Sequence, residues 1–317
     1  MYWCLGALRV PRITEMGIHL NQHMVPEPNC PLCGCAMKRL HDRWCYSCPV
    51  CATQGSTLPG LSRADLGRAK GPIDELSRQT GLRALRAEND ARIVGEIARY
   101  ATGRLLDVGS AYGWFLEEAR RAGFEAVGVE PDVDVAATCV SRGLDVRTGF
   151  FPDVMTPDDE FDVVCFNDTL EHLPDVRATL RIVHNMLAPN GLVAINIPVQ
   201  DGPIYRTARR LAKAGIDGPF RRMWQFGFSS PHIWYFSRAS LLQTLMRHGF
   251  APVRAVWLPS VSLAGIGHRV GYGGASRVAS MPTAAIAAFA TPILRRLSPT
   301  DNVLIIARRA DRSLPCS

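Results

Sequence analysis

The chain has 317 residues, of which 47% are hydrophobic and 21% charged, as in an ordinary globular protein. Its 36 basic and 29 acidic residues give a net charge of +7, which suits an anionic substrate, nucleic acid or a membrane surface without selecting among them. The sequence contains no apolar run of roughly 18 residues and no signal-peptide layout near its start. These features indicate a cytoplasmic protein with one large domain and a small appendage.

The N-terminal segment, residues 1–29, has little hydrophobic periodicity. We expect it to form a disordered arm, or to precede the true start of the protein.

Six of the ten cysteines fall in the next segment, "CPLCGCAMKRLHDRWCYSCPVC". It begins and ends with the same Cys-Pro-aliphatic-Cys phrase, and each C-x-x-C turn can present two thiolates to one ion. We therefore expect residues 30–56 to form a zinc-ribbon-like module. Its predicted metal ligands are Cys30, Cys33, Cys48 and Cys51. Four protein ligands leave zinc no open position, so the predicted role of the ion is structural.

Two further cysteines leave an alternative open in this segment. Cys45 and Cys48 also form a C-x-x-C pair, and Cys35 follows Cys33 closely. The repeated phrase favours pairing Cys48 with Cys51, but Cys35 or Cys45 can replace one of the four ligands. Free cysteines without a metal are the remaining interpretation.

Residues 57–103 are predicted to form a linker and then an amphipathic helix that follows Pro72. Beyond them, apolar strand-like runs alternate with helical patterns. Strands are predicted at 104–109, 125–130, 144–148, 161–166 and 191–197, with helices at 113–122, 132–142 and 175–188. This alternation is typical of an α/β domain, here residues 104–310, whose parallel sheet carries helices on both faces.

The stretch "RLLDVGSAYGWFLEEARRAGFEAVGVEPD" contains the most informative turn. Asp107, Gly109, Ala111 and Gly113 fill a D-x-G-x-G-x-G frame, with alanine at the middle glycine, between a buried strand and a helix. The glycines let backbone pass close to a ligand. Glu130 ends the next strand, where its carboxylate can accept both hydroxyl protons of a ribose. The pattern predicts an adenosyl ligand, either a dinucleotide or S-adenosylmethionine.

Motifs further along the chain favour the second ligand. They are "LLDVGSAYGWFL" at 105–116, "EHLPD" at 171–175, "GLVAINIP" at 191–198 and "HIWYFSRASLLQTLMRHGF" at 232–250. In this order the motifs closely resemble those of class I S-adenosylmethionine-dependent methyltransferases, in particular the broad group that acts on small molecules and glycans. The resemblance covers about residues 90–310.

The resemblance implies a Rossmann-like sheet of seven strands in the order 3-2-1-4-5-7-6, with the last strand antiparallel. Residues 253–258 and 303–307 would be strands six and seven. The implied cofactor-binding residues are Asp107, Gly109, Ala111 and Gly113 at the methionine end, Glu130 at the ribose, Gly149 and Phe150 near adenine, and Asn167.

Methyl transfer needs an acceptor atom aligned with the methyl group and a group that accepts its proton. His232, in "SSPHIWYFS", is one catalytic candidate, with packing against Trp234 and Tyr235 as the alternative. His172, in "EHLPD", is the other, with a role in shaping the pocket floor as the alternative.

The sequence therefore predicts a methyltransferase that uses S-adenosylmethionine, carries structural zinc, and methylates an oxygen of a sugar, glycan or other small metabolite. Nucleic acid is not the predicted partner, although an rRNA base methyltransferase with a zinc module is one alternative. A non-catalytic zinc-ribbon interaction protein with a vestigial methyltransferase domain is the other. An insertion at about 260–300 is predicted to form a lid, a dimer surface or a helix in peripheral contact with a membrane.

Overall fold

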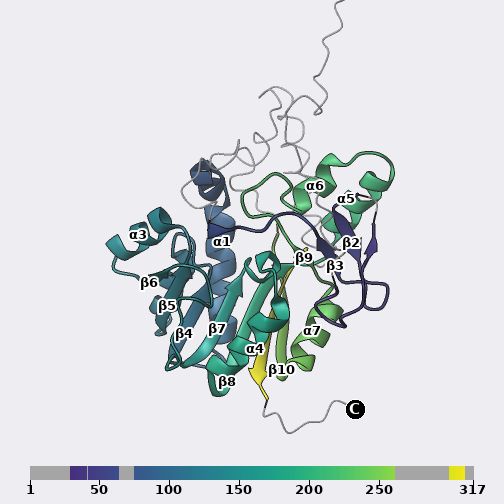
Figure 1. The fold of residues 1–317 in the computed structure, drawn as a ribbon. Helices are drawn as coiled ribbons and strands as arrows, with labels where there is room; N and C mark the ends of the chain where they lie inside the picture. The colour runs from purple at the N-terminus through teal and green to yellow at the C-terminus, as the bar shows by residue number, and fades with distance from the viewer. Residues whose placement is uncertain (1–28, 41, 64–74, 261–299, 311–317) are drawn as a thin grey trace, which may run out of the picture.

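The computed structural model describes residues 29–40, 42–63, 75–260 and 300–310. A large twisted sheet with helices on both sides makes up most of this part of the chain, and a small sheet lies at one end of it (Figure 1). The expectations for the N-terminal arm and for the 260–300 insertion lie outside the described residues, apart from residues 29, 260 and 300. Within the described residues, no helix combines the length and apolarity that crossing a membrane requires.

The large sheet has seven strands in the order β10-β11-β8-β7-β4-β5-β6. Their bounds are β4 Arg104–Val108, β5 Glu125–Glu130, β6 Asp145–Thr148, β7 Phe161–Asn167, β8 Leu187–Pro198, β10 Phe250–Leu258 and β11 Asn302–Arg309. Strand β11 runs antiparallel to both of its neighbours, and the pairs from β6 to β8 are parallel. Counted along the chain, this is the predicted order 3-2-1-4-5-7-6, which is confirmed.

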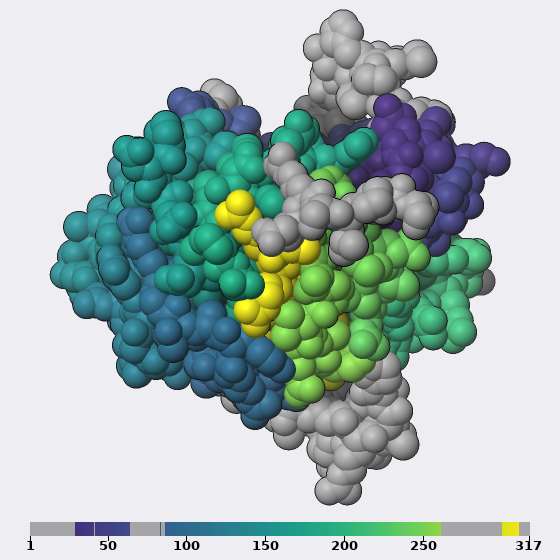
Figure 2. Space-filling view, turned by 90° about the horizontal axis from the view of Figure 1, so that it is seen from below, coloured from purple at the N-terminus to yellow at the C-terminus, as the bar shows by residue number. Residues whose placement is uncertain are grey.

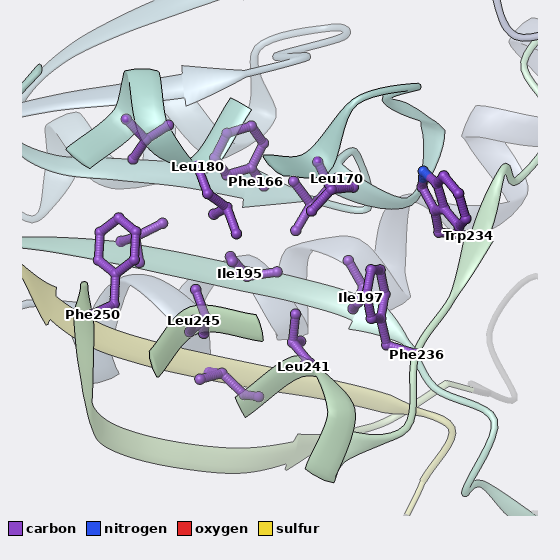
Figure 3. Close-up of a cluster of buried hydrophobic side chains, with 14 of the residues drawn as sticks. Phe166, Leu170, Leu180, Ile195, Ile197, Trp234, Phe236, Leu241, Leu245 and Phe250 are labelled. Atoms are coloured by element: carbon purple, nitrogen blue, oxygen red, sulfur yellow. The ribbon is translucent and has the colours of Figure 1, made fainter. Parts of the chain in front are cut away.

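Helices cover both faces of this sheet, because each face buries its own set of apolar side chains. The helices are α1 Glu75–Ile97, α2 Trp114–Arg121 and α3 Val133–Ser141 on one face, and α4 Val176–Met186 and α7 Arg238–Arg247 on the other. On the second face, Leu180 of α4 and Leu245 of α7 point toward Ile195 of β8 (Figure 3). The connections hold a short 3₁₀ helix, Leu170–His172, and the helices α5 Pro203–Lys213 and α6 Gly218–Met223.

The cysteine-rich segment forms a small antiparallel sheet that the large domain completes. Its strands are β1 Lys38–Arg39, β2 Cys45–Ser47, β3 Gln54–Ser56 and β9 Trp234–Tyr235, in that order. Strand β3 pairs with β9 through Gln54 opposite Tyr235 and Gly55 opposite Trp234. The fourth strand of the small sheet therefore comes from the "HIWYFS" motif of the large domain.

The cysteine-rich segment also shares its core with the large domain. Leu32, Met37 and Tyr46 are buried in the same cluster as the side chains of α4 and α7. Gln54 bonds with the side chains of Gln200 and Tyr205 in a buried group. Figure 2 shows the segment, in purple, packed against the later parts of the chain. So short a segment builds no core alone, and this shared packing supplies one.

The contact between β3 and β9 leads to a stability prediction. A Cβ atom at Gly55 would lie 2.7 Å from Cζ3 of Trp234, whose indole N–H already donates to the Leu173 carbonyl. We expect Gly55→Ala to lower the free energy of unfolding by roughly 1–3 kcal/mol, because the indole cannot move without losing that bond. Urea unfolding measures the change.

Gly95→Ala is the matched control for this substitution. Gly95 lies within α1 and has open space around its Cβ position. Alanine there should leave stability unchanged or raise it by about 0.5–1 kcal/mol. Equal unfolding free energies for Gly55→Ala and the unaltered chain would contradict the role of the close packing at β9.

Candidate active site

A cavity of about 590 Å³ opens at the carboxyl ends of β4, β5 and β7. It lies where the strand order reverses, because β4 leads outward to β5 and β6 on one side and pairs with β7 on the other. Ligands of open α/β sheets bind in the crevice at such a point. Six of the eight predicted cofactor-binding residues line the cavity, as do both candidate histidines: Asp107, Gly109, Ala111, Glu130, Phe150, Asn167, His172 and His232.

The carboxylate of Glu130 fixes the backbone of the turn that follows β4. This side chain accepts hydrogen bonds from the backbone N–H of Ala111 and of Asp132, both at 2.9 Å. Ala111 has a φ of 45°, in the left-handed region that glycine favours. The hydrogen bond that the Ala111 N–H donates to Glu130 fixes this amide, so the turn keeps its shape although the middle glycine of the frame is replaced.

The three glycines predicted to bind the cofactor, Gly109, Gly113 and Gly149, are required for different reasons. Gly109 lines the cavity, and a Cβ there would meet the Thr169 hydroxyl oxygen at 2.7 Å. Gly113 and Gly149 are not among the described residues that line the cavity. A Cβ at Gly113 would meet Leu144 at 2.4 Å, and a Cβ at Gly149 would meet Val154 at 2.4 Å. Internal packing is therefore enough to require glycine at these two positions.

Three carboxylates give this half of the cavity an acidic character. Asp107 is buried, and its Oδ1 has no hydrogen-bond partner among the described residues. Burial raises the pKa of Asp107 well above its usual range, and the nearby charges of Asp90 and Glu130 add to this. Burial also raises the pKa of Asp90 to about 7. A cationic ligand here would relieve the cost of these buried acids.

Asp90 is a site residue that the sequence analysis missed. It lies on α1 and accepts a hydrogen bond from Asn167, whose side-chain oxygen accepts one from Asn196. The sequence does contain a signal for it. Asp90 stands three residues before Ile93 and seven residues before Ile97, which places an acidic side chain on the apolar stripe of this helix. A charged residue at a core-facing position is a candidate for function.

Another part of the cavity wall holds Glu171, His172 and His232. The two imidazole rings lie 4.8 Å apart at 68°, and His232 Nε2 lies 3.9 Å from Glu171 Oε1. Glu171 is 1% exposed, and neither of its carboxylate oxygens has a hydrogen-bond partner among the described residues. Burial raises the pKa of Glu171 well above its usual range, and the charge of Asp168 adds to this.

The small sheet positions this part of the cavity wall. Ser56 of β3 donates its hydroxyl proton to the His232 carbonyl at 2.8 Å, and its N–H donates to the Ile233 carbonyl. Ile233 in turn donates its N–H to the carbonyl of Glu171 at 2.8 Å. One hydrogen-bonded path therefore leads from the cysteine-rich segment to the cavity wall. His232 also packs against Tyr235, one of the two residues in the alternative prediction, because the centroids of the two rings lie 5.3 Å apart.

The four predicted metal-ligand cysteines form a cluster. The sulfurs of Cys30, Cys33, Cys48 and Cys51 lie within 4.8 Å of one another. Cys45 is buried elsewhere, against Tyr205 and Trp224. The donor set suits a zinc ion, since four sulfurs converge and the N–H groups of Leu32 and Cys51 approach two of them.

The sequence of this chain is similar to those of known methyltransferases. A family model described as a methyltransferase domain matches residues 79–255. A ubiquinone biosynthesis O-methyltransferase of Azorhizobium caulinodans is 28% identical over 127 residues, which cover 38% of this chain and 48% of that protein. The protein of the same description from Paramagnetospirillum magneticum is 32% identical over 126 residues, with the same coverage. The chain spans about half the length of these curated relatives.

The fold also matches a solved structure of a SAM-dependent methyltransferase from Thermotoga maritima. The TM-score is 0.51 at 15% sequence identity, and the match covers 75% of this chain and 96% of the other. This likeness shows the fold alone.

The pKa of Asp90 leads to a prediction about pH. The folded chain keeps the proton until about pH 7, whereas the unfolded chain releases it near pH 3.8, so this group lowers stability progressively as pH rises through that window. Asp90→Asn removes the penalty. We expect the free energy of unfolding of the variant to gain on that of the unaltered chain by up to about 1.4 kcal/mol per pH unit. Denaturant unfolding of both proteins between pH 4 and pH 8 tests this. A difference in unfolding free energy that stays constant over this range would contradict it.

Proposed function

Because the chain belongs to the methyltransferase domain family, we propose that it is an S-adenosylmethionine-dependent methyltransferase that methylates an oxygen of a small-molecule acceptor. The family model covers more than half of the chain. The observation that carries the proposal is one cavity with two unlike halves. Carboxylates and a glycine turn line the first half, and two histidines with a buried glutamate line the second.

The first half suits the proposed cofactor. S-adenosylmethionine has two cationic groups, an ammonium and a sulfonium, and the sulfonium makes its methyl group electrophilic. Asp107 offers a buried carboxylate oxygen that has no partner among the described residues, which supports binding of the ammonium group there. Glu130 at the end of β5 would hold the ribose hydroxyls, and Phe150 would lie against the adenine ring. Asn167 and Ala111 complete this wall.

The second half would bind the acceptor. The proposed acceptor is a hydroxyl of a sugar, glycan or other small metabolite, and the relatives described as O-methyltransferases support transfer to oxygen. A hydroxyl must lose its proton as its oxygen is methylated. His232 and His172 are the side chains proposed to receive this proton, because both line the cavity and lie beside each other.

The four-cysteine cluster would hold a structural zinc ion. Four thiolates leave no open coordination position, so the ion would stabilise the loops before β1 and β3 rather than act on substrate. Through the pairing of β3 with β9, the same ion would support the wall that contains His232.

Titration with S-adenosylmethionine in a calorimeter tests the proposed function. We expect binding to the zinc-loaded chain and a loss of affinity of about 10- to 100-fold in Glu130→Ala, as for losing hydrogen bonds to a charged group. Glu125→Ala is the control, because Glu125 is exposed at the other end of the same strand. If the folded, unaltered chain does not bind the cofactor, the enzymatic proposal is wrong. With binding established, S-adenosylhomocysteine formed with amines and not with hydroxyl compounds would reject transfer to oxygen.

Metal analysis of the purified chain tests the zinc proposal. We expect one zinc ion per chain and its loss in Cys48→Ser, together with a lower free energy of unfolding, since structural zinc sites contribute roughly 10–16 kcal/mol of binding energy. Cys35→Ser should keep the ion, because Cys35 is a neighbour that lies outside the four-sulfur cluster. Zinc retained in full by Cys48→Ser would show that the sulfur set is wrong.

A further inference from the structure

We propose that Glu171, His172 and His232 form a second metal site, which takes a divalent cation in the acceptor half of the cavity. The cation would bind an oxygen of the acceptor and lower the pKa of its hydroxyl. With the ion bound, the two histidines would act as its ligands and no longer receive the proton themselves. The role toward the acceptor rests on the proposed function, whereas the binding of the cation does not. This site is separate from the four-cysteine cluster, and its donors are of a different kind.

The geometry of the three side chains fits one ion. Each offers a ligand atom within 4.8 Å of the other two. The 3.9 Å between Glu171 Oε1 and His232 Nε2 is too long for a hydrogen bond. It is close to the separation of two ligands that each lie about 2.0–2.2 Å from a shared cation. One carboxylate with two imidazoles is a donor set for divalent first-row metals, and it leaves coordination positions open.

The burial of Glu171 makes its charged form costly unless a cation, either a metal ion or a protonated His232, lies beside it. The side chain is 1% exposed, and within the described ranges neither of its oxygens has a hydrogen-bond partner. An ionised carboxylate buried in this way is costly unless it is paired or coordinates a metal. Buried acids with a structural role normally accept hydrogen bonds from neighbouring residues. Glu171 instead lines the cavity, so its position favours a ligand as its partner.

The imidazole of His172 is oriented as in known metal sites. Its Nδ1 lies 2.9 Å from the Pro231 carbonyl oxygen and 3.3 Å from the Ser230 hydroxyl. A proton on Nδ1 that is donated to this carbonyl leaves the lone pair on Nε2. Metal-bound histidines are commonly fixed by a backbone carbonyl in this manner.

The side chain of Gln225 adds a further ligand. Its amide nitrogen lies 2.8 Å from His232 Nε2. A half-turn of the amide group brings the oxygen to the place of the nitrogen, and this oxygen can then coordinate the same ion. With four protein donors, an octahedral ion keeps two positions. This favours acceptors that present two neighbouring oxygens, which would chelate the ion.

The site is tested by titrating Mn²⁺ into the full chain that carries a single zinc ion, in the cysteine cluster, and following the loss of the electron paramagnetic resonance signal of free Mn²⁺. Manganese is the chosen probe because it prefers oxygen ligands such as a carboxylate to the thiolates of the cysteine cluster. We expect saturable binding, weakened about 10-fold or more in Glu171→Gln. His172→Gln is a second variant at a half-buried position, and it should weaken binding in the same way should Glu171→Gln fail to fold.

Asp90→Asn is the matched control for the charge of the cavity. It removes a buried carboxylate from the cofactor half and should leave Mn²⁺ affinity unchanged. Absence of Mn²⁺ binding to a chain that binds S-adenosylmethionine would overturn the metal site and leave the proposed function intact. Equal affinities for the unaltered chain and a folded Glu171→Gln or His172→Gln variant would also overturn it. Mn²⁺ binding without cofactor binding would support the site and reject the proposed function.

Discussion

The parallel pairing of β4 with both β5 and β7 is the constraint on which the rest of the structure depends. It sets Asp107 opposite Gly128 on one side and Cys165 on the other, so three strands end at the same edge of the sheet. Glu130, Asp107 and Asn167 therefore meet around one cavity although they lie far apart in the sequence. A slip of one residue would turn Asp107 to the other face of the sheet and bury its apolar neighbours wrongly, so core packing and site geometry fix the same register.

Much of this arrangement could be predicted from the sequence because its signals are local. Each signal is a short stretch of the chain: the turn after β4, Glu130 at the end of β5, and the repeated C-x-x-C phrase. The strand order follows from the family that these signals indicate. Asp90 was missed because only the packing of α1 against β7 places this side chain in the cavity wall, although an acidic residue on the apolar stripe of the helix was a local signal of it. The strand β9 was missed for a similar reason: two residues carry no periodicity, and only contact with Gln54 and Gly55 makes them a strand.

The cavity concentrates polar groups that folding alone would not favour. Asp107 and Glu171 are almost fully buried, and each has an oxygen without a hydrogen-bond partner in the described part of the chain. Such groups lower the stability of the folded state, and the two apolar clusters on either face of the sheet offset that cost. The two halves of the cavity also differ in their support. The part with the glycine turn and the carboxylates is built by the sheet and α1, whereas the part with Glu171 and the two histidines relies on the small sheet.

The pairing of β3 with β9 also has a consequence for the order in which the chain folds during synthesis. Ser56 and His232, which this pairing joins, are 176 residues apart. A ribosome adds about 5–20 residues each second, so the cysteine-rich segment waits many seconds before its last strand emerges. During that time β3 is an edge strand with unpaired backbone groups, the kind of edge that recruits other chains. Early capture of a metal ion by the cysteines would hold the segment compact through this interval, before there is any cavity for it to support.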